Sequence, residues 1–374
     1  MQRSLLTWIL SEKGDHDMSK TRPMHKSRLW YLLPIFFHVI GGLIGYLIVK
    51  KSNSVLAKRL LLVGIILSAI VTGIVIYVYA IFQADMSAAY GRISTGNHIT
   101  QTANGTLEYA DLGEGNPVLV VHGAGGGYDQ GLLLSQIFFG EDSDQFRLIA
   151  PSRFGFLHTP LPGSDNSSRS FAAQADAFAD MLDRLGIEKA AVVGFSAGGP
   201  SSIEFALRHP EKTSQLVLVS AVLHNEPPLQ PSDDAVLNGL FKSDFAFWFL
   251  GKYMQPQLLS FLGVTPEVQA KLTSEDRSWV SDAFLPSLNP ISPRQPGMLN
   301  DRINFVSIGY PIEKVSVPTL IVSAKDDTLV NPSHSAYAAQ KIPAASHLEF
   351  ESGGRVLLGH HNDTRSAVTG FLAQ

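Results

Sequence analysis

The run Gly194-Phe195-Ser196-Ala197-Gly198 constrains the fold of this chain more than any other feature of its sequence. It follows the apolar run AAVV and opens a segment in which apolar residues have helical spacing. A serine between a strand and a helix occupies a sharp, strained turn, which exposes its hydroxyl above the sheet, and flanking glycines relieve the crowding of that turn. The run therefore predicts a strand–turn–helix unit that presents Ser196 as a nucleophile.

Strand and helix signals alternate on both sides of this unit. Asn104-Gly105 lies between two alternating runs, which indicates a β-hairpin because both turn positions need positive φ. The further buried-strand runs are NPVLVVHG, FRLIAPSRFG, SQLVLVS, VPTLIVSAKDD and HLEFE. Strands that alternate with helices after an opening hairpin predict an α/β fold, with a mostly parallel sheet covered by helices on both faces.

A glycine-rich loop follows the first buried strand, in VVHGAGGGYDQG at residues 120–131. Such a loop leaves backbone N–H groups free to stabilise a developing oxyanion, together with the N–H of the residue after the nucleophile. We expect Ala124 and Ala197 to supply these donors, with Gly125 as the near alternative to Ala124. His122 is interpreted as a residue that orients the loop. A dinucleotide loop is disfavoured because the third glycine of G-x-G-x-x-G is missing.

From about residue 97 to residue 374 the chain resembles the α/β-hydrolase fold family, in the branch of single-domain esterase and C–C hydrolase-like enzymes. The segments that carry the resemblance are HGAGGG, GFSAGG, PSRFG and SAKDDTLVNP. The resemblance implies a catalytic triad in the order Ser, Asp, His, with the acid after the seventh strand and the histidine after the eighth. It selects Ser196 as nucleophile and Asp327 as the acid that orients the histidine, and leaves Asp326 as a solvated loop residue.

The histidine is missing from its expected place. In ESGGRVLLGHH, residues 351–361, Arg355 stands where the family carries the base, and an arginine cannot accept the proton. In one hypothesis His360, or alternatively His361, acts as the base, and we assign His360. In a second, Arg355 pairs with Asp327 and the protein binds ligands without efficient catalysis. In a third, the arginine is a recent change from histidine.

An insertion between the sixth and seventh strands, at about residues 224–312, is expected to form a helical cap. Its aromatic residues with helical spacing are Phe241, Phe245, Phe247, Trp248, Tyr253 and Trp279. An apolar cap predicts an apolar acyl or ring-containing substrate. We expect His158, Phe195 and Trp248 to line the substrate pocket.

Two charge-free apolar stretches, at residues 29–49 and 60–82, are each long enough to cross a bilayer. The linker 50–59 carries four Lys or Arg residues, whereas residues 83–92 carry one. The positive-inside rule therefore predicts a membrane hairpin with a cytoplasmic linker and an extracytoplasmic C-terminal domain. The expected organisation is an N-terminal tail (1–28), a transmembrane hairpin (29–83) and a hydrolase domain (84–374).

Composition excludes several other kinds of protein. The formal net charge of −4 gives no indication of a nucleic-acid partner, and the absence of cysteine excludes disulfides and thiolate metal sites. The sequence contains no motif for a metal or a cofactor, so none is expected. The main hypothesis is a membrane-anchored serine hydrolase that cleaves an ester, or a related acyl bond, of a small or medium apolar substrate. The alternative is a catalytically impaired ligand-binding protein on the same fold.

Overall fold

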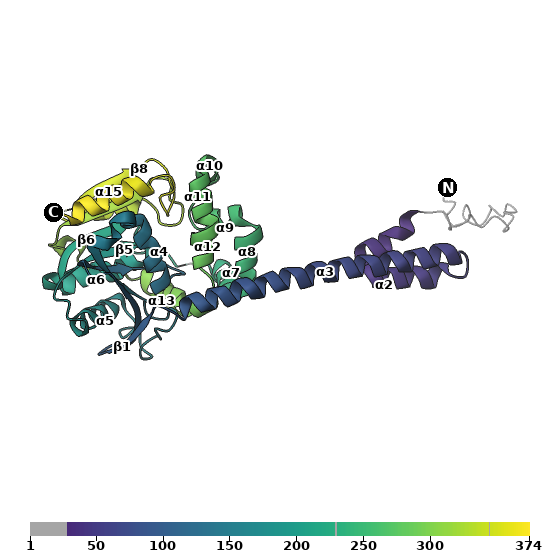
Figure 1. Cartoon of the computed structure of the whole chain (residues 1–374), viewed down its shortest axis with the longest axis horizontal. Coiled ribbons are helices and arrows are strands. Elements are labelled where there is room, and N and C mark those ends of the chain that lie inside the picture. Colours follow the sequence, from purple (N-terminus) through teal and green to yellow (C-terminus); the bar gives the residue numbers. More distant parts are fainter. Residues whose placement is uncertain (1–27, 229, 344) are drawn as a thin grey trace, which may run out of the picture. The chain divides into compact units, whose positions relative to one another are not determined.

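The computed structural model describes residues 28–228, 230–343 and 345–374 (Figure 1). The predicted N-terminal tail therefore lies outside the described residues, except for Arg28. The described chain divides into two compact units at Ile81 and Phe82.

The first unit is a pair of helices. They are η2 (Arg28–Tyr31) with α2 (Leu32–Val49), and α3 (Ser54–Ile93), which continues into the second unit. The helices approach closely at glycines, because a Cβ on Gly42 would stand 2.8 Å from the Leu60 carbonyl oxygen and one on Gly64 would stand 2.5 Å from that of His38. Small residues allow this kind of packing between apolar helices. Both helices are long and apolar enough to cross a membrane, and their crossing stays a prediction.

The second unit is built on one eight-stranded sheet in the order β1-β2-β4-β3-β5-β6-β7-β8. The strands are β1 (His98–Thr102), β2 (Gly105–Leu112), β3 (Asn116–Val121), β4 (Phe146–Pro151), β5 (Ala190–Phe195), β6 (Thr213–Val219), β7 (Thr319–Ala324) and β8 (Ala345–Phe350). β1 and β2 form the predicted antiparallel hairpin, with Thr102 opposite Gly105, and β2 pairs antiparallel with β4. The pairs from β4 to β8 are parallel, which confirms the predicted mostly parallel sheet.

Helices cover both faces of this sheet. They are α4 (Tyr128–Phe138), α5 (Phe171–Arg184), α6 (Gly199–Arg208), α14 (Ser333–Lys341) and α15 (His361–Leu372). The apolar sides of α4 and α15 join one buried cluster, and those of α5, α6 and α14 join another. The strands of a parallel sheet are buried on both faces for this reason, and β5 and β7 are buried at every position.

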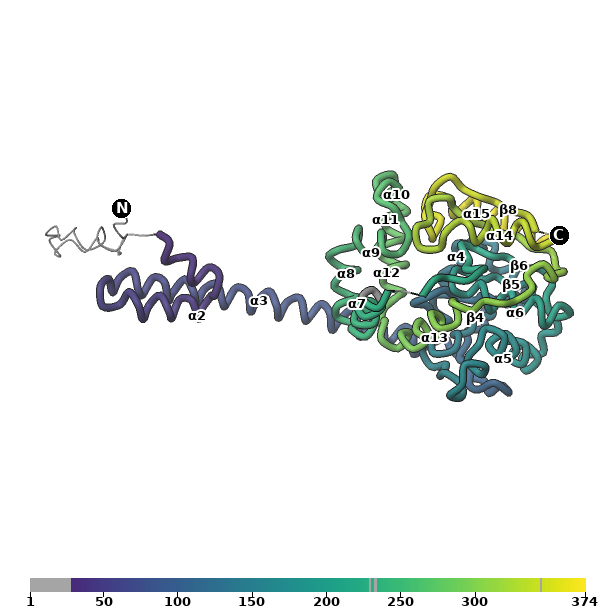
Figure 2. The backbone as a smooth tube through the Cα atoms, turned by 180° about the vertical axis from the view of Figure 1, so that it is seen from behind, coloured from purple at the N-terminus to yellow at the C-terminus, as the bar shows by residue number. Residues whose placement is uncertain are grey.

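The insertion between β6 and β7 folds into a series of helices, which lie together beside the sheet in Figure 2. They are α7 (Pro231–Lys242), α8 (Asp244–Tyr253), α9 (Gln255–Phe261), α10 (Pro266–Lys271), α11 (Ser274–Ser278), η6 (Trp279–Phe284), α12 (Leu285–Ser287), η7 (Ser292–Arg294) and α13 (Gln295–Phe305). The remaining short turns are η3 (Gly140–Gln145), η4 (Ser196–Gly198), η5 (Pro210–Lys212) and η8 (Ile312–Lys314). We call residues 231–305 the cap.

The last three turns of α3, residues 82–93, belong to the second unit and contact both the cap and α4. Asp85 accepts a hydrogen bond of 2.8 Å from the Trp248 indole and forms an ion pair of 3.0 Å with Lys252. Arg92 donates to the Asn289 carbonyl at 2.5 Å and lies 3.5 Å from the carboxylate of Asp129 on α4. This end of α3 therefore joins the cap to the α4 side of the sheet.

We expect Arg92→Ala to lower the free energy of unfolding of the second unit by about 1–2 kcal/mol, because charged hydrogen bonds are lost from a side chain that is only partly exposed. Thermal or denaturant unfolding of the full chain in detergent measures this change. Arg184→Ala, which removes an exposed i,i+4 pair with Asp180, serves as the control and should change stability by less than about 0.5 kcal/mol. Equal effects of the two substitutions would contradict the role given to Arg92.

Candidate active site

Ser196 stands at the turn between β5 and α6, as the sequence predicts. Its φ is 51°, a left-handed conformation that is unfavourable for a residue with a Cβ. The turn is crowded: a Cβ on Gly194 would lie 2.4 Å from Ser202 Oγ, and one on Gly198 would lie 2.5 Å from the Val121 carbonyl oxygen. The two glycines are therefore required for the close approach of chain segments that presents Ser196.

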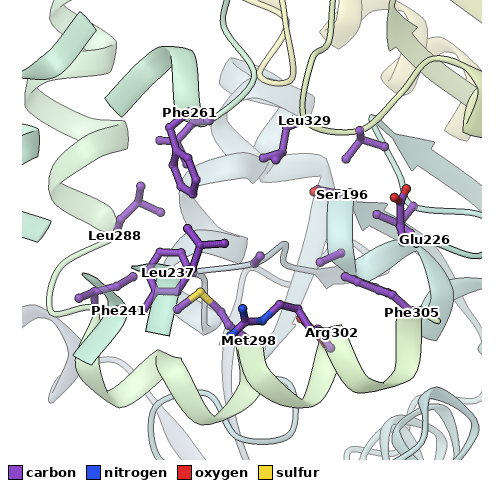
Figure 3. Close-up of a pocket in the computed structure, with 18 of the residues that line it drawn as sticks. Ser196, Glu226, Leu237, Phe241, Phe261, Leu288, Met298, Arg302, Phe305 and Leu329 are labelled. Carbon is purple, nitrogen blue, oxygen red and sulfur yellow. The ribbon is translucent and has the colours of Figure 1, made fainter. Parts of the chain in front are cut away.

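Ser196 opens into a cavity of about 360 Å³ between the sheet and the cap (Figure 3). Ala124, Gly125 and Ala197, the predicted oxyanion donors, line the same cavity. The apolar part of the lining comprises Val222, Pro227, Pro228, Leu237, Phe241, Phe247, Phe261, Leu262, Leu288, Ile291, Met298, Phe305, Leu329 and Val330. The cavity therefore suits the apolar part of a small molecule.

The loop after β3 is held by buried polar contacts. His122 is fully buried, and its Nε2 accepts a hydrogen bond of 2.9 Å from the Arg153 backbone N–H. Nδ1 therefore carries the proton and donates to the Gly123 carbonyl at 2.7 Å. Burial and the Arg153 charge hold the pKa of His122 well below its usual range. His122 is thus a neutral residue that fixes the loop, and neither of its ring nitrogens is free to accept the serine proton.

Arg153 also joins this loop to the cap. Its guanidinium donates through Nε to the His122 carbonyl at 2.9 Å and forms two hydrogen bonds of 2.7 Å with the Asp301 carboxylate on α13. A second buried pair, Arg294 with Asp129, links the cap to α4 at 2.8–2.9 Å. The sequence interpretation did not include these pairs, because their partners are 148 and 165 residues apart.

Asp327 follows β7 and is buried. Its Oδ1 accepts hydrogen bonds from the backbone N–H groups of Leu329 at 2.9 Å and Val330 at 3.0 Å, whereas Oδ2 has no hydrogen-bond partner among the described residues. Burial raises the pKa of Asp327 to about 6, although these two donors and the charge of Arg355 favour its ionised form.

Asp326 is not the solvated loop residue that the sequence interpretation expects. Its carboxylate accepts hydrogen bonds from the N–H groups of Gly354 at 2.8 Å and Gly353 at 3.3 Å. Both glycines have positive φ, 133° and 60°. Asp326 therefore fixes the turn that leads to Arg355.

Arg355 lies between the acid and the nucleophile. Its Nη2 and the Ser196 Cβ are each 3.1 Å from the point where a Cβ on Gly123 would stand. Its carbon Cζ lies 5.4 Å from the centre of the Phe195 ring, and its own Cβ shares the space around Gly263 with Asp327 Oδ1. Burial lowers the pKa of Arg355 to about 10, so the guanidinium is charged at neutral pH.

Arg355 and Asp327 attract each other, but they form no ion pair within 4.0 Å in the described chain. The Nε of Arg355 has no hydrogen-bond partner among the described residues. The hypothesis that Arg355 occupies the place of the histidine thus agrees with the geometry, while the direct pairing with Asp327 that it proposed is not present.

The structure does not bring His360 or His361 to Ser196. The His360 ring stacks on Phe350 with centroids 4.2 Å apart, and its Nδ1 lies 3.5 Å from Asp363. His361 donates through Nε2 to the Val356 carbonyl at 2.9 Å and packs against Trp279. Neither histidine is among the described residues that line the Ser196 cavity, so the predicted assignment of His360 as base would require a rearrangement of the loop that precedes α15.

The three residues expected in the substrate pocket lie outside the lining of this cavity. The Nδ1 atom of His158 lies 2.6 Å from Oε1 of Glu108, because this buried carboxylate attracts the imidazole. Phe195 is buried in the apolar core beneath Arg355, and Trp248 turns away to Asp85. The cap contributes other aromatic residues instead, and helical spacing did identify two of them, Phe241 and Phe247.

We expect the stability of Asp327→Asn, relative to the native chain, to increase as the pH rises from about 4 to 7.5. Over this range the folded native chain must release a proton from a carboxyl whose pKa is about 6, whereas the unfolded chain releases it near pH 4. Ionisation therefore removes up to about 3 kcal/mol from the native chain and nothing from the variant. Unfolding curves across this pH range measure the difference, and a difference that does not change with pH would contradict the assignment.

The left-handed turn at Ser196 predicts that Ser196→Gly is more stable than Ser196→Ala by about 1 kcal/mol, because both lose the hydroxyl but only alanine keeps the strained Cβ. Ser135 in α4 provides the control. There the order should be reversed, since glycine destabilises a helix interior by about 1 kcal/mol. Thermal unfolding of the four variants measures these stabilities. The same order of glycine and alanine at both positions would contradict backbone strain at Ser196.

Comparisons with known proteins agree with this geometry. The α/β hydrolase fold family model matches residues 116–361. The chain is 36% identical to a 2-hydroxymuconate semialdehyde hydrolase of Pseudomonas putida over 272 residues, which cover 71% of this chain and 89% of that protein. It is 29% identical over 282 residues to a protein of Bacillus subtilis named "Uncharacterized hydrolase YcgS", with 72% of this chain and 95% of that protein covered.

Among solved structures, an α/β hydrolase fold protein from Nakamurella multipartita matches with a TM-score of 0.63 and 26% identity, over 74% of this chain and 98% of that one. A meta-cleavage product hydrolase matches with a TM-score of 0.56 and 25% identity, over 74% and 98% of the two chains. The strand order, the serine turn and these similarities lead to one conclusion: the chain belongs to the α/β hydrolase fold family, and its relatives are hydrolases.

Proposed function

We propose that this protein is a membrane-anchored serine hydrolase that cleaves an ester, or a related acyl bond, of a small or medium apolar substrate. The observation that supports this most strongly is Ser196, held at φ 51° where β5 ends and open to an apolar cavity beneath the cap. Strain is retained at such a position only where the surrounding structure maintains it, and strained residues cluster at functional sites.

The proposed reaction begins when Ser196 Oγ attacks the acyl carbon while its proton passes to a water molecule. The N–H groups of Ala124, or Gly125, and Ala197 would stabilise the oxyanion, because backbone donors aimed at developing charge act strongly where water is excluded. The acyl–oxygen bond then breaks, the alcohol leaves with a proton, and water releases the acid from Ser196. Arg355 cannot accept the first proton, so we expect slow turnover in the native chain.

The substrate class follows from the cavity and from the relatives. Most of the lining is apolar, and the cap contributes leucine and phenylalanine side chains to it. Relatives are named as hydrolases of small organic molecules such as 2-hydroxymuconate semialdehyde. We therefore include cleavage of a C–C bond beside a carbonyl among the related reactions proposed for this site. Both reactions place a carbonyl carbon at Ser196 and an oxyanion at the glycine-rich loop.

The membrane anchor is proposed from the two apolar helices. Only 6% of the most apolar part of α3 is buried inside the molecule, so its apolar side chains require another apolar environment. From the Lys and Arg residues between the helices we infer a cytoplasmic linker and a hydrolase domain on the other side of the membrane. An anchored enzyme would meet apolar substrates at the bilayer surface.

A second candidate function is ligand binding without efficient turnover. The observation that favours it is Arg355, a buried cation beside Ser196 where a serine hydrolase needs an imidazole. General acid–base catalysis contributes about 10²–10⁴-fold to rate. Without a general base, only the oxyanion donors and the positioning of the substrate would accelerate the reaction.

Hydrolysis of p-nitrophenyl butyrate by the full chain in detergent distinguishes the two functions. We expect the native chain to exceed the Ser196→Ala baseline, and Arg355→His to increase turnover by at least about 100-fold, because it restores a base beside Asp327. Native turnover at the baseline, together with a gain in Arg355→His, would support the ligand-binding function. No turnover in either protein would contradict the hydrolase proposal.

His360→Ala belongs in the same assay. The native rate should be retained, since the His360 ring stacks on Phe350 away from the cavity. Loss of the native rate in this variant would instead identify His360 as the base, after a rearrangement of the loop that precedes α15.

A further inference from the structure

The charged residues that line the Ser196 cavity differ in how many of their polar atoms already form hydrogen bonds within the protein. Glu226, Asp301 and Arg302 all line it (Figure 3). Both oxygens of Asp301 accept hydrogen bonds from Arg153. The terminal nitrogens of Arg302 are likewise occupied, by the Asp234 and Asn238 side chains of α7 at 2.5 and 2.6 Å.

Glu226 is held differently. Its Oε1 accepts a hydrogen bond from Nε2 of His334, while Oε2 has no hydrogen bond to any described residue. About one third of the Glu226 side chain remains exposed. Oε2 is therefore the charged atom of the described lining that is available to a ligand.

The orientation of Glu226 is determined by a buried histidine. His334 is 1% exposed, and its Nδ1 accepts hydrogen bonds from the backbone N–H groups of Leu223 at 3.0 Å and His224 at 3.2 Å. Its proton must consequently lie on Nε2, where it faces Glu226. The ring also stacks on His224 with centroids 3.6 Å apart. A neutral imidazole thus fixes the carboxylate without neutralising its charge.

We infer that Glu226 selects the ligand: the cavity takes an apolar molecule that carries a hydrogen-bond donor, a hydroxyl or an amine, and it disfavours one that carries a carboxylate. A carboxylate group inside a cavity of low polarity repels a second anion. A hydroxyl or ammonium group would donate to Glu226 Oε2 while the apolar part packs against Phe305 and the cap. The inference rests on the proposed function in one respect only: it takes this cavity as the site that binds the ligand.

Three ligands with the same apolar part test this selection: 4-phenylbutan-1-ol, 4-phenylbutylamine and 4-phenylbutanoate. Their binding to the full chain in nanodiscs is measured by calorimetry at pH 7.5, with empty nanodiscs subtracted. We expect the alcohol and the amine to bind at least about 10-fold more tightly than the carboxylate, a factor that corresponds to about 1.4 kcal/mol.

Glu226→Gln keeps the shape and the acceptor for His334, and it should bring the alcohol and the carboxylate within about 3-fold of each other. Glu267→Gln on α10, outside the cavity, is the matched control and should retain the native order. Equal binding of carboxylate and alcohol by the native chain, an unchanged order in Glu226→Gln, or no binding of any of the three would overturn the inference. Because binding needs no turnover, this result is independent of the ester assay that tests the proposed function.

Discussion

The buried contact between Arg153 and Asp301 determines much of the geometry around Ser196. The guanidinium is completely buried, and it reaches the oxyanion loop through the His122 carbonyl and the cap through α13. A buried charge that loses its partner destabilises a protein by about 3–5 kcal/mol. The loop and α13 are therefore energetically coupled through Arg153. Displacement of α13 would leave the Arg153 charge unpaired, and displacement of the loop would remove the hydrogen bond from Arg153 to the His122 carbonyl. The cavity between them keeps its shape for the same reason.

Arg355 shows the opposite situation, a buried cation with incomplete pairing. Its neighbours are the face of Phe195 and the carboxylate of Asp327, beyond ion-pair distance. The charge near Asp327 offsets part of the cost of burial, and the aromatic face contributes a smaller amount. Each residue raises the cost of removing the other, so the Asp327–Arg355 combination can persist without serving acid–base catalysis. The position is thus chemically different from a histidine site.

Local sequence patterns predicted the parts of the structure that depend on neighbouring residues. The strand–serine–helix turn, the Asn104-Gly105 hairpin and the parallel sheet all follow from spacing within short segments. What could not be predicted depends on contacts between distant segments. His158 and Trp248 turn away from the cavity because Glu108 and Asp85, each far away in the chain, provide stronger partners.

The same limit applies to the charged residues of the cavity. Glu226 lies in a loop and His334 lies in α14, 108 residues further along the chain, so no motif joins them. A weak signal was present: Glu226 lies in the segment after β6, which ends at Val219, and side chains beyond the carboxyl ends of parallel strands commonly reach the ligand site of an α/β fold. Asp326 gave no such signal, since its partners are backbone N–H groups of a turn whose conformation only the folded chain defines.

The distribution of strong contacts indicates which part of the cap can move. The segment from Asn289 to Asp301 is tied to α3, α4 and the oxyanion loop by Arg92, Arg294 and Arg153, and two of these three side chains are completely buried. Helix α7 is also held to α13, because Arg302 binds the Asp234 and Asn238 side chains. Helix α9 contacts the cavity through the apolar side chain of Phe261, and apolar contacts of this kind can slide at little cost. A ligand of the Ser196 cavity is therefore expected to enter by displacement of α9, while α7, α13 and the oxyanion loop stay in place.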